Sequence, residues 1–166
     1  MRHLVFVLWI SIVIMMCSCV IFAQNAPTSS AVCTFTDGNQ ISIRYDQPKA
    51  AKEPLPMGKV WSPNGVRMDL FTETPLNVSN TVIQPGAYSF YFIPEKDTWT
   101  LIVNKNVTAG AAYDQQQDVV REKMKTEKLD QAEPQLNIYF GHLAPKQCTM
   151  RVDYGKLRAF GDINQQ

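Results

Sequence analysis

Histidine and cysteine are scarce in this chain, which narrows the chemistry open to it. Of two histidines and four cysteines in 166 residues, only His142, Cys33 and Cys148 lie beyond residue 23. A Ser-His-Asp or Cys-His site would have to use His142, but no Gly-x-Ser-x-Gly elbow or cysteine nucleophile motif accompanies it. A zinc site needs clustered Cys and His. We therefore expect no catalytic residue, metal site or cofactor, with a metal held by carboxylates alone left open, and interpret His142 as a turn residue at a strand end.

The chain also lacks an excess of charge of either sign. The chain has 16 Lys and Arg against 15 Asp and Glu, and no basic block that would attract nucleic acid or anionic lipid. It has no Gly-rich phosphate loop and no repeat of 20 to 50 residues. These absences exclude a nucleic-acid partner and a solenoid or propeller.

The first 23 residues differ from the rest. An uncharged run of residues 4–22 follows Arg2 and His3 and ends at the small residue Ala23, which is typical of a secretory signal. We predict a signal peptide (1–23, helical), a flexible mature N-terminus (24–31) and one domain (32–166) that is periplasmic or secreted, with no membrane span after cleavage. Two alternatives stay open: an uncleaved anchor, because the run is long enough to span a bilayer, and lipidation at Cys19.

Removal of the signal leaves one pair of cysteines, Cys33 and Cys148. Export would bring this pair into an oxidising compartment, and two cysteines allow only one connectivity. We expect a disulfide between them. Two buried free thiols are the alternative.

The mature chain shows alternation of apolar and polar residues, interrupted by turns. The clearest hairpin has Tyr88, Phe90 and Phe92 on one strand, and Trp99 and Leu101 on the other. Many short strands with turns between them predict an all-β domain, an antiparallel β-sandwich or barrel-like fold built of short hairpins.

Three segments depart from this pattern. Residues 46–58 are rich in proline and predict an irregular connector, followed by a short strand at 59–61. Residues 104–117 lack periodicity and predict a long surface loop, a kind of segment that is often functional. Residues 118–129 fit either a helix or an exposed strand, and we favour the strand because the neighbouring segments are strands.

Carboxylates are the remaining catalytic candidates. Asp69 with Glu73, or Asp114 with Asp118, could support glycoside hydrolysis across a cleft, with one raised pKa. Exposed carboxylates on a sheet are usually just solvated, and alternating aromatics are usually core.

Several segments resemble those of the bacterial family called domain of unknown function 2911. They are Cys33-Thr34-Phe35-Thr36-Asp37-Gly38, Gly58-Lys59-Val60-Trp61, Pro85-Gly86-Ala87-Tyr88-Ser89, Ile93-Pro94, 99–105, Tyr113-Asp114 and Cys148-Thr149-Met150. The resemblance covers nearly all of the mature chain. It implies a secreted or periplasmic bacterial protein with a β-rich fold, and it brings no established activity.

One stretch departs from the family pattern. In the family, Val-Trp is typically followed by Arg, a variable residue, Gly-Ala-Asn and often Glu, whereas here residues 62–67 read Ser-Pro-Asn-Gly-Val-Arg. Either this member has lost or changed a family function, or the segment only shapes a turn.

We therefore predict a non-catalytic exported protein of the cell envelope, a binding or structural module with a glycan or protein partner. The candidate ligand-binding residues are Trp61, Asn64 and Arg67 near the turn, and Tyr113 and Asp114 in the long loop. The alternatives are a carboxylate-based hydrolase acting on an envelope glycan or similar polymer, and a subunit of an envelope assembly.

Overall fold

Strands make up most of the computed structural model, which describes residues 28–166. The only helical segments in that range are two short 3-10 turns, η1 (Pro63–Gly65) and η2 (Gln115–Gln117). The strands are β1 (Thr28–Thr34), β2 (Gln40–Asp46), β3 (Met68–Thr72), β4 (Leu76–Val78), β5 (Thr81–Ile83), β6 (Gly86–Pro94), β7 (Thr98–Asn104), β8 (Asp118–Ala144) and β9 (Gln147–Gln165). The predicted all-β class is confirmed, and β1 begins before the domain boundary predicted at residue 32.

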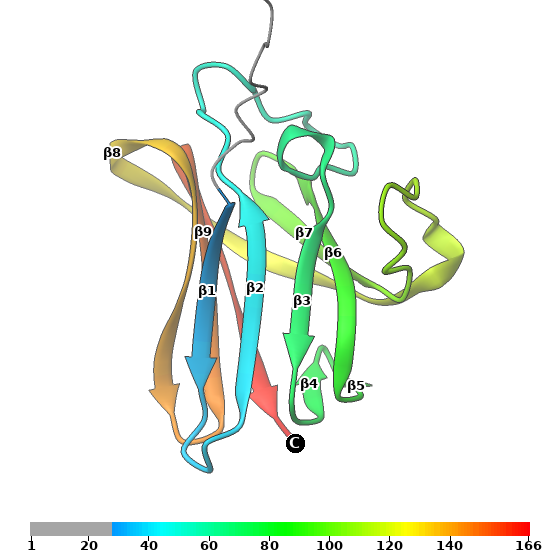
Figure 1. The fold of residues 1–166 in the computed structure, drawn as a ribbon. Helices are drawn as coiled ribbons and strands as arrows, with labels where there is room; N and C mark the ends of the chain where they lie inside the picture. Colours follow the sequence, from blue (N-terminus) through cyan, green and yellow to red (C-terminus); the bar gives the residue numbers. More distant parts are fainter. Residues whose placement is uncertain (1–27) are drawn as a thin grey trace, which may run out of the picture.

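The strands form one antiparallel sheet in the order β1-β2-β3-β6-β7-β8-β9-β4-β5. Figure 1 shows β1, β2, β3 and β6 side by side in front, with β9 and the end of β8 behind them. The sandwich-like shape therefore arises from a single sheet that folds over, and not from two separate sheets.

The sheet folds over because its two longest strands, β8 and β9, bend sharply. Their ladder joins residues 125–128 to 157–160, and then residues 137–144 to 147–153, with register shifts between the two stretches. Gly155 lies opposite Glu133 in the shifted region and has φ +58, a left-handed conformation that favours glycine. Thr149 and Asp162, both on β9, form a hydrogen bond of 2.6 Å, although thirteen extended residues would span roughly 40 Å. The long hairpin thus folds back on itself, unlike the short hairpins predicted.

The core lies between the two layers. Alternate residues of the front strands, such as Ile41 and Ile43 of β2, pack against inward residues of β9 such as Met150 and Val152. Tyr45 spans the layers, because its hydroxyl donates to the carbonyl of Ile138 (3.2 Å) and accepts from that residue's N–H (2.8 Å). The predicted disulfide is present between Cys33 of β1 and Cys148 of β9, with the two Cα atoms 6.5 Å apart.

The structure shows the conformation of the segments that depart from the regular strand pattern in the sequence. Residues 118–129 are strand, as favoured, and form the first part of β8. The long loop predicted at 104–117 is present at 105–117, because Asn104 is the last residue of β7, and it ends in η2. The strand predicted at 59–61 reduces to a single β-bridge between Trp61 and Phe92. The predicted signal helix at 1–23 lies outside the described residues.

Candidate binding surfaces

The turn after Trp61 is organised around one carboxylate. Trp61 is 5% exposed, and its indole N–H donates to Oε1 of Glu53 at 2.8 Å. The backbone N–H of Asn64 donates to the same carboxylate, at 3.1 and 3.0 Å from its two oxygens. Asn64 has φ 53, a conformation that asparagine tolerates. Glu53 therefore joins two of the predicted ligand-binding residues, although its place in a proline-rich connector gave no sequence signal for this role.

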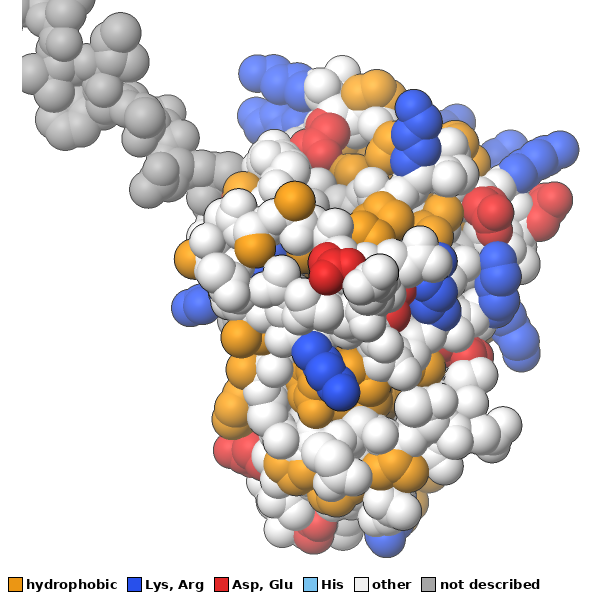
Figure 2. Space-filling model, turned by 90° about the vertical axis from the view of Figure 1, so that its right-hand side faces the viewer, with side chains coloured by type: hydrophobic (Ala, Val, Ile, Leu, Met, Phe, Trp, Pro, Cys, Tyr) orange, Lys and Arg blue, Asp and Glu red, His pale blue; other side chains and the backbone are white. Residues whose placement is uncertain are grey.

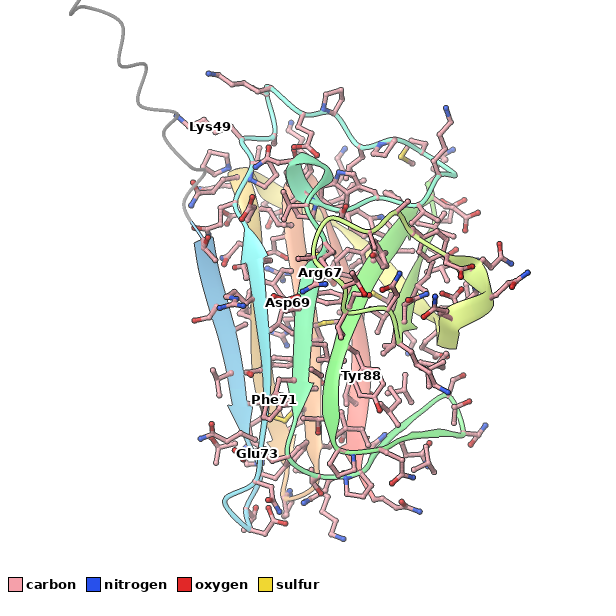
Figure 3. The ribbon with its side chains drawn as sticks, turned by 45° about the vertical axis from the view of Figure 1, so that its right-hand side comes forward. Lys49, Arg67, Asp69, Phe71, Glu73 and Tyr88 are labelled. Carbon is pink, nitrogen blue, oxygen red and sulfur yellow. A yellow bond between two sulfur atoms is a disulfide. The ribbon has the colours of Figure 1, made fainter. Side chains whose placement is uncertain are left out.

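Arg67 connects this turn to the long loop. Its Nε donates to Asp69 at 2.9 Å, and its Nη1 donates to the carbonyl of Val107. Asp69 also accepts from Arg44 of β2 at 3.1 Å. Figure 3 shows Arg67 and Asp69 close together on the outer face of the sheet, with Phe71 farther along β3 and Glu73 just beyond its end. The guanidinium of Arg67 is thus used within the protein.

Asn104 and Ser89 hold the loop 105–117 on the outer face of β6 and β7. The Asn104 amide donates to the carbonyl of Asp114 and to the Asp118 carboxylate, both at 2.8 Å, and its oxygen accepts from the N–H of Asn106 at 2.9 Å. The Ser89 hydroxyl donates to the carbonyl of Asn106 at 2.9 Å. The inner side of the loop is fastened by side chains while most of its outer residues are exposed.

Tyr113 and Arg121 complete the network around Asp118. The Tyr113 hydroxyl donates to Asp118 at 2.7 Å, and Arg121 donates to Asp118 at 2.7 Å and to the Tyr113 oxygen at 2.5 Å. Burial, followed by the hydrogen bond to the Asp118 carboxylate, raises the pKa of Tyr113 to about 12. The ring packs on Tyr91, with centroids 5.0 Å apart.

The side chain of Asp114 caps the short turn η2. It accepts from the N–H of Gln116 and the amide of Gln117, both at 3.0 Å, and these bonds, that to Gln117 first, lower its pKa. The structure thus brings Arg67, Tyr113 and Asp114 to one loop and places Trp61 and Asn64 in the Glu53 cluster. All five have bonding partners within the chain, and their role in ligand binding stays a prediction.

The face that carries this loop has no large area of one charge. In Figure 2, which turns the right-hand side of Figure 1 toward the viewer, small hydrophobic areas alternate with polar side chains, and basic and acidic groups are interspersed along the rim. Electrostatics alone therefore gives this face no preference for a charged partner.

A groove of about 440 Å³ lies where the folded β8–β9 hairpin brings its two halves together. No sequence pattern pointed to it, because its walls are distant in the chain. All lining residues except Ser79 belong to β8 or β9. The lining consists of Ser79, Glu122, Lys123, Lys125, Leu143, Thr149, Arg151, Phe160, Gly161, Asp162 and Asn164.

The charged side chains of the groove differ in whether they have partners. Lys123 is ion-paired with Glu95 at 3.0 Å, and Asp162 accepts from Thr149. The side chains of Glu122, Lys125 and Arg151 make no hydrogen bond or ion pair to any residue of the range 28–166. Three charges in this groove are therefore available to a ligand.

A partly buried ion pair supports the wall next to Arg151. Asp153 is 2% exposed and binds the guanidinium of Arg158 through two bonds of 2.6 and 2.7 Å, which raise the pKa of Arg158. Tyr139 donates to the same carboxylate at 3.1 Å, and its ring centroid lies 6.0 Å from the Arg151 guanidinium carbon and 5.8 Å from that of Arg158. Arg151 is thus positioned beside a fixed aromatic ring.

Metal ligation has no candidate in the described part of the chain, where no three His, Cys, Asp or Glu residues lie close enough to hold an ion. Nor does the range 28–166 contain a helix long and apolar enough to cross a membrane.

Comparison with known proteins gives one match. A family model described as a protein of unknown function (DUF2911) matches residues 26–160. Neither the curated proteins nor the solved structures contain a match.

Proposed function

The chain belongs to the DUF2911 family of proteins of unknown function, and from that premise we propose that it is an exported, non-catalytic binding module of the bacterial cell envelope. The observation that carries the proposal is the groove between the two halves of the β8–β9 hairpin. Its volume of about 440 Å³ falls within the usual range of small-molecule sites, roughly 300 to 1,000 Å³. Strand positions give it rigid walls, which reduces the ordering cost of binding.

Export is supported by two independent features. The Cys33–Cys148 disulfide is typical of proteins that fold in an oxidising compartment. The uncharged run of residues 4–22 ending at Ala23 has the form of a signal peptide, cleavage of which would release a periplasmic or secreted domain. An uncleaved anchor or lipidation at Cys19 would keep the same domain at the membrane surface.

The contacts of the carboxylates favour binding over hydrolysis. Asp69 is bound by two arginines, Glu73 accepts from the N–H of Gln40 at 2.9 Å, and Asp114 and Asp118 belong to the loop network. A general acid of a glycosidase needs a raised pKa and access to the scissile bond. The four carboxylates considered for that role are instead used to hold strands and loops together.

Native mass spectrometry tests the proposal. The mature protein is purified gently from the cells that produce it and compared with the Lys125→Ala/Arg151→Ala double variant and with Lys128→Ala, an exposed lysine of β8 that does not line the groove. We expect excess mass in the wild type and in Lys128→Ala that vanishes on denaturation and is absent from the double variant. A bare monomer in every sample contradicts the proposal. If the double variant keeps the ligand and an additional Arg67→Ala variant loses it, the loop and not the groove is the binding surface.

A further inference from the structure

We propose that the groove takes a segment of a neutral, hydroxyl-rich sugar chain and does not take a polyanion or a polycation. The inference rests on the proposed function, since it names the ligand class of the same groove. It follows from the charge balance of the lining, from the kinds of hydrogen-bonding group in it, and from the one aromatic ring at its surface.

The charges of the lining balance. Glu95 already neutralises Lys123, which leaves two cations, Lys125 and Arg151, and two carboxylates, Glu122 and Asp162, in the lining. A polyanion would gain from the cations and be repelled by the carboxylates, and a polycation would meet the reverse. Neither class obtains a net electrostatic advantage.

A neutral hydroxyl ligand can use both kinds of charge. A hydroxyl group donates one hydrogen bond and accepts others. Lys125 and Arg151 supply only donors and Glu122 supplies only acceptors, while Ser79 and Asn164 supply both. Hydrogen bonds to charged groups are the stronger kind, so sugar hydroxyls match every polar group along this groove.

Phe160 adds an apolar face among these polar groups. It is half-buried and lies directly opposite Lys125 in the β8–β9 ladder, so the two residues stand about 5 Å apart at Cβ. Leu143, 64% exposed, lines the same groove. A sugar ring has polar edges and an apolar face, and an aromatic ring beside charged donors offers both types of contact.

Isothermal titration calorimetry with three tetrasaccharides tests this assignment. The probes are the neutral N-acetylglucosamine tetramer, its deacetylated cationic form and the anionic galacturonic acid tetramer. We expect the neutral tetramer to bind measurably and the two charged tetramers to bind at least about tenfold more weakly, since each would bring its charges beside lining groups of the same sign. Stronger binding of either charged tetramer overturns the inference.

Variants assign the binding to the groove. Lys125→Ala and Phe160→Leu should each weaken binding of the neutral tetramer by about tenfold, the loss expected for one charged hydrogen bond or one ring contact, whereas Lys128→Ala should leave it unchanged. Equal affinity in all four proteins would place the sugar elsewhere and overturn the inference.

A ligand of another chemical class, found by native mass spectrometry and lost in the double variant, would overturn the sugar assignment and leave the proposed function standing. No ligand in either experiment contradicts both. Release of shorter sugars from the neutral tetramer would show that the protein hydrolyses the chain, and would overturn the proposed non-catalytic function.

Discussion

The loop 105–117 and the groove are both polar surface regions, but they differ in where their polar groups are directed. At the loop, Tyr113 converges with Asn104 of β7 and Arg121 of β8 on the Asp118 carboxylate, and the distances in this network are 2.5 to 2.8 Å. In the groove, Lys125 and Arg151 have no such partner among the described residues. A polar cluster that satisfies itself stabilises the fold, whereas unsatisfied charges on rigid strands are available for recognition.

This comparison separates stability from binding. Changes in the loop network should lower stability and leave the groove's ligand affinity intact, while changes at the charged groove residues should do the reverse. The disulfide forms a special case, because Cys148 directly precedes Thr149 in the wall of the groove.

Removal of the disulfide should have the largest effect. The bridge joins residues 115 positions apart, and loop-closure models assign such a crosslink about 5 kcal/mol. We expect the Cys33→Ser/Cys148→Ser variant to lose several kcal/mol in urea unfolding, with amide exchange rising more at 147–151 than in the loop. An unchanged unfolding midpoint, or faster exchange confined to the loop, would contradict the expectation that the bridge stabilises the domain and the strand segment next to Cys148.

Asp118→Ala should have the next largest effect. Its carboxylate is 11% exposed and accepts from three side chains, so its loss leaves Arg121 and Tyr113 without their acceptor and costs about 3 kcal/mol. Urea unfolding measures the loss, and Asp114→Ala, which removes a more exposed acceptor, serves as the milder control. Equal destabilisation by both variants would show that Asp118 is not the centre of the network.

Alkaline pH should weaken the loop specifically. The pKa of Tyr113 is about 12 in the folded protein against 10.0 for a free tyrosine, so the stabilisation that it reflects is fully present below pH 10 and is lost as the pH rises through 12. Urea midpoints at pH 9 and 11.5 should fall more in the wild type than in Tyr113→Phe. A parallel fall in both proteins would mean that other groups govern the alkaline response.

Lys125→Ala should change stability least. Its side chain is exposed and unpaired within residues 28–166, and such surface substitutions usually stay within about 0.5 kcal/mol. Urea unfolding beside Lys128→Ala checks the value. Destabilisation comparable to that of Asp118→Ala would remove the distinction between the two regions.

The local structure was predictable because the front strands alternate in sequence. The hairpin of β6 and β7 follows from the aromatic residues Tyr88, Phe90 and Phe92 at alternate positions of the first strand and the alternation in the return strand, and the disulfide from the presence of a single cysteine pair. The pattern of 118–129 was ambiguous because Val120 and Met124 have helical spacing, but pairing with β7 and β9 imposes the strand.

The groove could not be predicted from the sequence. It depends on the fold-back of β8 and β9 at Gly155, which brings Lys125 beside residues of a second ladder, and a lone glycine does not specify such a bend. Nor did the sequence indicate that Glu53 would bond to the Trp61 indole, since that contact crosses an irregular connector.

Chemical-shift mapping of the bound sugar tests the central claim most directly. With ¹⁵N-labelled protein and the neutral N-acetylglucosamine tetramer, we expect the amide signals of residues 122–125, 149–151 and 160–164 to move while those of 105–117 stay in place. Shifts confined to 105–117 and to the turn at 62–67 would show that the loop is the binding surface and would contradict the account.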